Sequence, residues 1–188
     1  MKKHASIRLL VLLLVYLAVA LPFKVMEIIP GFADIRPVTM LGPIYGVFFG
    51  PLGCLAFAIG NLLADILSDS LRWSSIAGFA ANFCGPFLIY WYWTHISKKA
   101  FSLDTMRAIG THVLVVILAA ILEAALITPM VALAYPDVDA QLFALSVVVN
   151  TSAFPILFGI PLAILLQTEL GFRPIPPRER PSPAADKD

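Results

Sequence analysis

The 188-residue chain is 60% hydrophobic and only 13% charged, whereas soluble domains average about 45–50% apolar and about 25% charged residues. A water-soluble protein of this size has too little interior to bury so much apolar surface. The two cysteines, Cys54 and Cys84, lie in apolar runs and predict neither a disulfide framework nor a metal site. A formal net charge of +1 also lacks the clustered cations that nucleic-acid binding needs. The composition excludes a soluble enzyme, a secreted disulfide scaffold and a nucleic-acid-binding protein, and it indicates an integral membrane protein in a lipid bilayer.

The first apolar segment, 7–23, is long enough to span a membrane, which takes about 17–25 residues. Its basic start, its apolar run and the sequence Ala18-Val19-Ala20 also resemble a secretory signal peptide. We expect the segment to be retained as a helix, because its removal would leave an odd number of spans and spoil the charge balance of the chain.

The next apolar stretch, 38–67, is too long for a single span. As one helix it would reach about 45 Å, against a hydrocarbon core about 30 Å thick. Gly50-Pro51 in its middle is a helix-breaking signal. The stretch therefore predicts two short antiparallel segments, 38–49 and 51–67.

Three further stretches, 74–94, 107–134 and 142–167, each qualify as a span. With six segments and both termini inside, ten of the thirteen cations lie on the cytoplasmic side, as the positive-inside rule requires. These are Lys2, Lys3, Arg8, Lys98, Lys99, Arg107, Arg173, Arg178, Arg180 and Lys187, whereas Lys24, Arg36 and Arg72 remain outside. The fold class predicted is an all-α integral membrane protein, a six-helix transmembrane bundle with N-in/C-in topology and short second and third helices.

The predicted membrane domain covers residues 1–172. The remaining residues, 173–188, are rich in proline and charge and predict a disordered cytoplasmic tail. No internal repeat and no second domain is evident in the sequence.

Polar side chains gather at similar depth in the predicted outer half of the membrane. The segment 51–67 carries Asn61 and Asp65 there, Trp73 lies at the outer rim, and 74–94 carries Asn82. Polar groups in hydrocarbon cost several kcal/mol each unless they are paired, so these side chains are expected to face one another or a wet cavity. The topology therefore predicts a polar cavity open to the outside.

Two later segments add to this cluster: 107–134 carries Glu123 slightly past its midpoint, and 142–167 carries Asn150 in its outer half. Asn82 and Asn150 are equally explained by hydrogen bonds between helices. A lone carboxyl at this depth must be protonated, paired or solvated, which favours a functional role for Glu123. Ligand-binding residues are predicted from this cluster and from the outer loop beside it: Arg36, Asn61, Asp65, Trp73, Asn82, Glu123 and Asn150.

Most of the sequence, 7–168, resembles a known family, and the motifs that carry the resemblance are concentrated in 34–69. An outer loop with Ala33-Asp34-Ile35-Arg36-Pro37 precedes GPIYGVFFGPLG at 42–53 and AIGNLLADIL at 58–67. This arrangement resembles the substrate-binding S components of energy-coupling factor (ECF) transporters. The resemblance implies a six-helix subunit in a prokaryotic cell membrane that binds a vitamin or similar micronutrient from outside. It places the ligand near the extracellular face, under the loop that joins the first two helices.

The resemblance also implies partners. S components dock on a membrane-embedded coupling (T) subunit that carries two cytosolic ATPases. The small-residue AxxxA face that family members often use for docking is missing, since the first helix offers only Ala18 and Ala20. No Walker A motif is present, so P-loop ATP hydrolysis by this chain is excluded. We expect a transport subunit that is not an enzyme and that has no cofactor.

Two other functions remain open. Asn61, Asp65 and Asp69 match three of the four positions of the NDxxDxxxD motif with which membrane prenyltransferases hold Mg²⁺ against a diphosphate. Leu62 stands where the motif requires its second residue, aspartate, and no second acidic motif follows. The alternatives are a membrane enzyme acting on a lipid diphosphate with Mg²⁺, and a membrane sensor or accessory subunit without transport activity.

Overall fold

The computed structural model describes residues 2–24, 26–29, 33–97 and 99–177. Its α-helices are α1 (Lys2–Ala20), α2 (Leu41–Leu67), α3 (Ser74–Trp91), α4 (Met106–Ala134), α5 (Ala140–Phe154) and α6 (Ile160–Thr168). Short turns of other helix types extend or join them: η1 (Leu21–Phe23), η2 (Pro37–Met40), η3 (Tyr92–Ile96) and η4 (Pro155–Gly159). The predicted all-α fold class is confirmed.

Among the described residues, four stretches are long and apolar enough to cross a membrane: His4–Phe23, Pro37–Leu67, Met106–Ala134 and Ala140–Thr168. The last of them runs through α5, η4 and α6, as the single predicted segment 142–167 requires. The predicted segment 74–94 forms α3 and η3, but it is not among these four apolar stretches.

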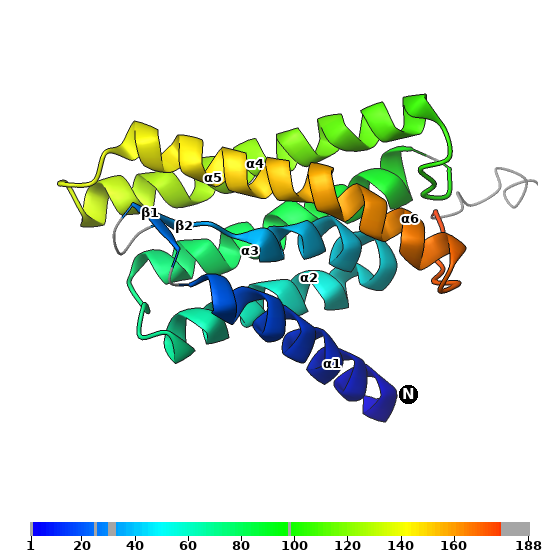
Figure 1. The fold of residues 1–188 in the computed structure, drawn as a ribbon, viewed down its shortest axis with the longest axis horizontal. Coiled ribbons are helices and arrows are strands. Elements are labelled where there is room, and N and C mark those ends of the chain that lie inside the picture. The colour runs from blue at the N-terminus through cyan, green and yellow to red at the C-terminus, as the bar shows by residue number, and fades with distance from the viewer. Residues whose placement is uncertain (1, 25, 30–32, 98, 178–188) are drawn as a thin grey trace, which may run out of the picture.

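The helix α2 is broken in its middle, at the predicted position. Gly50 has φ 59° and ψ −143°, a conformation that glycine adopts readily because it has no Cβ. The chain reverses there, and the rings of Tyr45 and Phe57 lie 6.0 Å apart across the turn. In a straight helix these two residues would be about 18 Å apart along the axis. The predicted break at Gly50-Pro51 is confirmed, and Figure 1 shows the two halves of α2 side by side.

The segment after α6 packs against this break. Pro51 has no backbone N–H, so the carbonyl of Val47 lacks its usual donor within the helix. The N–H of Ile175 donates to that carbonyl at 3.0 Å, and the ring of Phe172 packs edge-on against Phe48 with centroids 6.2 Å apart. Ile175 of the predicted tail thus lies against α2, while residues 178–188 lie outside the described part of the chain.

Aromatic residues join α1 to both halves of α2. Tyr16 packs edge-on against Phe57 with ring centroids 5.0 Å apart, and its hydroxyl donates to Asn61 Oδ1 at 3.3 Å. The hydroxyl of Tyr45 donates to the carbonyl of Leu12 at 2.7 Å. These contacts satisfy two buried hydroxyls in an apolar core and hold the first helix against the bundle.

A small antiparallel ribbon follows α1. It pairs β1 (Glu27–Ile29) with β2 (Ala33–Asp34), with Glu27 opposite Asp34 and Ile29 opposite Ala33. We call the end of the molecule that holds this ribbon and the connections 68–73 and 135–139 the ribbon end. The start of α1, the turn at Gly50 and the end of α6 lie at the opposite end (Figure 1).

Candidate functional site

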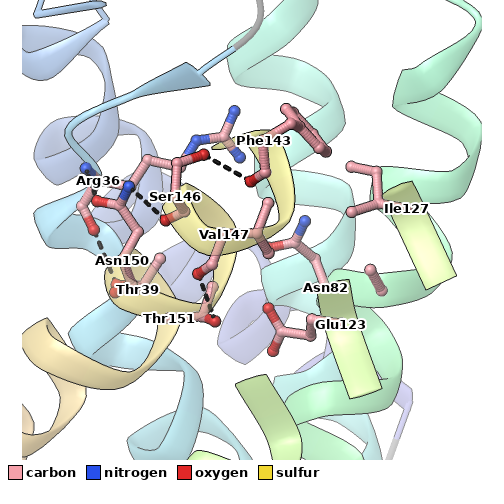
Figure 2. Close-up of a pocket in the computed structure, with 11 residues that line it drawn as sticks. Arg36, Thr39, Asn82, Glu123, Ile127, Phe143, Ser146, Val147, Asn150 and Thr151 are labelled. Carbon is pink, nitrogen blue, oxygen red and sulfur yellow. Dashed lines mark hydrogen bonds between the residues drawn. The ribbon is translucent and has the colours of Figure 1, made fainter. Parts of the chain in front are cut away.

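A cavity of about 50 Å³ lies toward the ribbon end, enclosed by α3, α4, α5 and the segment that leads into α2. Its walls combine polar side chains with an apolar patch. The lining residues are Arg36, Thr39, Ala81, Asn82, Glu123, Ile127, Phe143, Ser146, Val147, Asn150 and Thr151. Figure 2 shows the side chains of Asn82, Glu123 and Thr151 directed into the same space from three helices.

The carboxyl group in the cavity belongs to Glu123, whose side chain is only 8% exposed. It lies directly against the backbone of Gly85 on α3, where a Cβ would overlap its Oε1 atom. Within the part of the chain that the structure describes, neither oxygen of this carboxyl has a hydrogen-bond or salt-bridge partner. Because a buried carboxyl without a hydrogen-bond partner is costly, Glu123 makes this cavity the candidate binding site of the chain.

The segment before α2 is tied to α5 by hydrogen bonds at the edge of the cavity. The backbone N–H of Arg36 donates to Asn150 Oδ1 at 3.0 Å. The hydroxyl of Thr39 lies 2.8 Å from the carbonyl oxygens of both Arg36 and Asn150. Asn150 also donates through Nδ2 to the carbonyl of Ser146 at 3.0 Å. These bonds hold Arg36 and Thr39 over the site and close it on one side.

Four of the seven predicted site residues line this cavity: Arg36, Asn82, Glu123 and Asn150. They come from four separate elements, and the tertiary fold brings them together. Asn61 lies beside the cavity, where its Oδ1 accepts from Tyr16 and, at 3.4 Å, from Nη1 of Arg36. Asn61 is therefore linked to the site through Arg36.

The other two predicted residues lie elsewhere. Asp65 is 6% exposed and belongs to a second polar cluster, in which Lys24 Nζ lies 2.6 Å from its Oδ1 and the hydroxyl of Ser75 donates to its Oδ2 at 3.0 Å. Trp73 is 74% exposed and is not part of the cavity lining. The membrane depth predicted from the sequence groups Asp65 and Trp73 with Glu123. In the structure the side chain of Asp65 lies in a different polar cluster, and that of Trp73 lies on the surface.

The residues proposed for a Mg²⁺ site do not converge. Asn61 accepts hydrogen bonds from Tyr16 and Arg36, and Asp65 is paired with Lys24. Asp69 is exposed on the turn after α2, with φ 54°. Among the described residues, no group of three or more His, Cys, Asp or Glu side chains is arranged to hold a metal ion.

Several lining residues are absent from the predicted set of seven, although the sequence already places Ser146 and Thr151 in the outer half of the segment 142–167. Ser146 lies one turn before Asn150 on α5, so helical periodicity places it on the same face, and Thr151 directly follows Asn150. Thr39 gives no such signal, because it precedes α2 and reaches the site only through its contacts with α5. The apolar wall, made of Ala81, Ile127, Phe143 and Val147, cannot be told from ordinary helix packing in the sequence.

Comparisons with known proteins returned nothing for this chain: no family model matches it, and no curated protein or solved structure matches it.

Proposed function

We propose that the chain is the substrate-binding S component of an ECF-type uptake transporter for a vitamin or similar small micronutrient. In this proposal it is a multi-pass protein of a prokaryotic cell membrane with six membrane segments and both termini in the cytoplasm. It works with a membrane-embedded coupling subunit and two cytosolic ATPases. The sequence of residues 33–67 motivates the proposal, and the cavity supports it.

One observation carries the proposal: polar side chains from four elements converge on one cavity with an unpartnered carboxyl in it. The cavity lies toward the end of the bundle that the charge distribution places outside the cell. The segment 36–39 that covers it belongs to the connection between α1 and α2, as expected for a binding subunit of this family.

The volume of the cavity indicates how a ligand enters. At about 50 Å³ it is smaller than the roughly 300–1,000 Å³ of typical small-molecule pockets. The wall made by Arg36 and Thr39 lies at the start of η2, next to the irregular connection from β2, and hydrogen bonds tie it to α5. We therefore expect this segment to move outward when a vitamin-sized ligand enters and to close over it afterwards.

Binding and uptake measured on separate preparations test this function. The purified chain in detergent is expected to bind one compound from a library of water-soluble vitamins with a Kd in the micromolar range or below. Concentrative uptake is expected only in cells that also contain a coupling subunit and its ATPases. Accumulation by the purified chain alone, in liposomes without an ion gradient, would contradict the proposal. So would Mg²⁺-dependent turnover of a lipid diphosphate.

The topology gives a second test. A cysteine introduced at Asp137, in the connection between α4 and α5, is expected to react with a membrane-impermeant maleimide added to intact cells. A cysteine at Lys99, between η3 and α4, is expected to react only after the cells are opened. Cys54 and Cys84 are first replaced by alanine so that their thiols do not contribute. The reverse labelling pattern would overturn the proposed orientation.

A further inference from the structure

The hydroxyl groups around the cavity are available only as hydrogen-bond acceptors. Ser146 Oγ lies 2.7 Å from the carbonyl of Phe143, and Thr151 Oγ1 lies 2.9 Å from the carbonyl of Val147. A carbonyl oxygen can only accept, so in both contacts the hydroxyl must supply its one proton. The hydroxyl of Thr39 likewise spends its proton on backbone carbonyls. Each of these oxygens is left with lone pairs alone for a ligand.

Asn82 adds a further acceptor. Its Nδ2 donates to the carbonyl of Gly78 at 2.7 Å, and the opposite amide orientation would bring two acceptor oxygens together at that distance. The orientation of the amide is therefore determined by this contact, and Oδ1 is directed away from the carbonyl. In Figure 2, Asn82 and Glu123 occupy the same side of the cavity.

Together with the Glu123 carboxyl, these groups form a site rich in acceptors, next to an apolar wall that includes Ile127 and Phe143. The Arg36 side chain is a cationic donor in the lining; its Nη1 donates to Asn61 at 3.4 Å, and its positive charge interacts with Glu123. A buried carboxylate favours a cation, and neutral acceptors favour N–H groups over quaternary nitrogen. An anionic group beside Glu123 would be repelled and would find no donor among the three hydroxyls.

We propose that the ligand is a small molecule with a positively charged nitrogen that bears at least one hydrogen, such as an ammonium group or a protonated heterocycle. This nitrogen binds to Glu123 and is surrounded by the acceptor oxygens of Asn82, Ser146 and Thr151. The apolar part of the ligand packs on Ile127 and Phe143. This inference rests on the proposed binding function and specifies the chemical class of its substrate.

Thermal-shift and equilibrium-binding measurements on the purified full-length chain test the proposal. The probes are water-soluble vitamins and their precursors, sorted at pH 7.5 into cationic, neutral and anionic compounds. The tightest-binding compound is expected to be a cation with an N–H group. Methylation that replaces every hydrogen on its charged nitrogen is expected to weaken binding at least tenfold.

Variants locate the charge that recognises this compound. Glu123→Gln keeps the shape of the side chain and is expected to weaken binding about 10- to 100-fold, whereas Glu123→Asp is expected to lie between this variant and the wild type. Glu169→Gln removes a carboxylate from the exposed end of α6 and serves as the matched control, with unchanged affinity expected. Circular dichroism and size-exclusion profiles verify that each variant is folded.

The outcomes separate the two proposals. If the tightest ligand is anionic or lacks an N–H group, or if Glu123→Gln binds it as tightly as the wild type, the cationic class is wrong while the binding function stands. If the wild-type chain binds no compound of any class, the binding function fails, and the inference about its ligand falls with it.

Discussion

Two carboxyl groups of this protein, those of Asp65 and Glu123, are buried in different environments. Asp65 is 6% exposed and has both a salt bridge with Lys24 and a hydrogen bond from Ser75. Glu123 is 8% exposed and, in the described part of the chain, has neither. The partners of Asp65 come from the connection after α1 and from α3, so this cluster ties the ribbon end together.

The two carboxyls show how a structural polar group and a candidate ligand-binding group differ inside an apolar helix bundle. Burial alone does not distinguish them, because both carboxyls are equally hidden. A carboxyl whose oxygens are all engaged stabilises the fold, and its replacement leaves a partner unpaired. A carboxyl that faces a cavity without a partner contributes little to folding and is available for a ligand. Mutation of Asp65 is therefore expected to lower stability more than binding, and mutation of Glu123 is expected to lower binding more than stability.

The largest effect on stability is expected for Asp65→Asn. The change removes the carboxylate charge beside the Lys24 ammonium, which is 13% exposed and also donates to Ser70, and breaking a buried pair in this way costs about 3–5 kcal/mol. The melting temperature in detergent measures the loss. The double variant Lys24→Met with Asp65→Leu is expected to recover most of it, because it removes both charges together.

A matched control for this prediction is Asp69→Asn, at the exposed turn four residues later. Its melting temperature is expected to stay within the range of ordinary surface changes, about 0.5 kcal/mol. Equal effects at Asp65 and Asp69 would show that the salt bridge contributes nothing, and the contrast between the two carboxyls would be lost.

A smaller loss of stability, with a large loss of binding, is expected for Gly85→Ala. The added methyl group overlaps the carboxyl of Glu123, so the carboxyl must move and the packing between α3 and α4 must adjust. Overpacking of this kind costs about 1–3 kcal/mol, and a displaced carboxyl is expected to weaken ligand binding at least tenfold. Melting temperature and Kd are measured on the same preparation.

The control for this change is Gly110→Ala on α4, where an added Cβ meets no atom within 4 Å. Replacing glycine by alanine within a helix stabilises it by about 0.5–1 kcal/mol, so this variant is expected to be slightly more stable and to bind normally. Normal binding by Gly85→Ala would mean that the position of the Glu123 carboxyl is unimportant for recognition.

The smallest effect on stability is expected for Glu123→Gln. The substitution breaks no hydrogen bond or ion pair seen in the described residues and removes a charge from a buried position, so the stability should change by less than about 1 kcal/mol. Thermal unfolding of the ligand-free protein measures this. A destabilisation as large as that of Asp65→Asn would identify Glu123 as a structural group, with a partner that forms only in the membrane.

Several features of the fold follow from local sequence and were predicted correctly. The apolar runs determine where helices form, because backbone groups in hydrocarbon must be hydrogen-bonded within their own segment. The break in α2 follows from Gly50 and Pro51, since one residue permits the turn and the other lacks a donor. Asn82, Glu123 and Asn150, which the sequence places at a common predicted depth, line one cavity in the structure.

Depth along a helix axis does not specify direction around it, and only the tertiary structure supplied that information. Asp65 and Glu123 were grouped by depth, yet the rotation of α2 turns Asp65 toward Lys24, while α4 directs Glu123 toward Gly85 and the cavity. Thr39 reaches the site through hydrogen bonds across more than a hundred residues of sequence. Long-range contacts of this kind depend on how the helices pack together, and no local pattern encodes them.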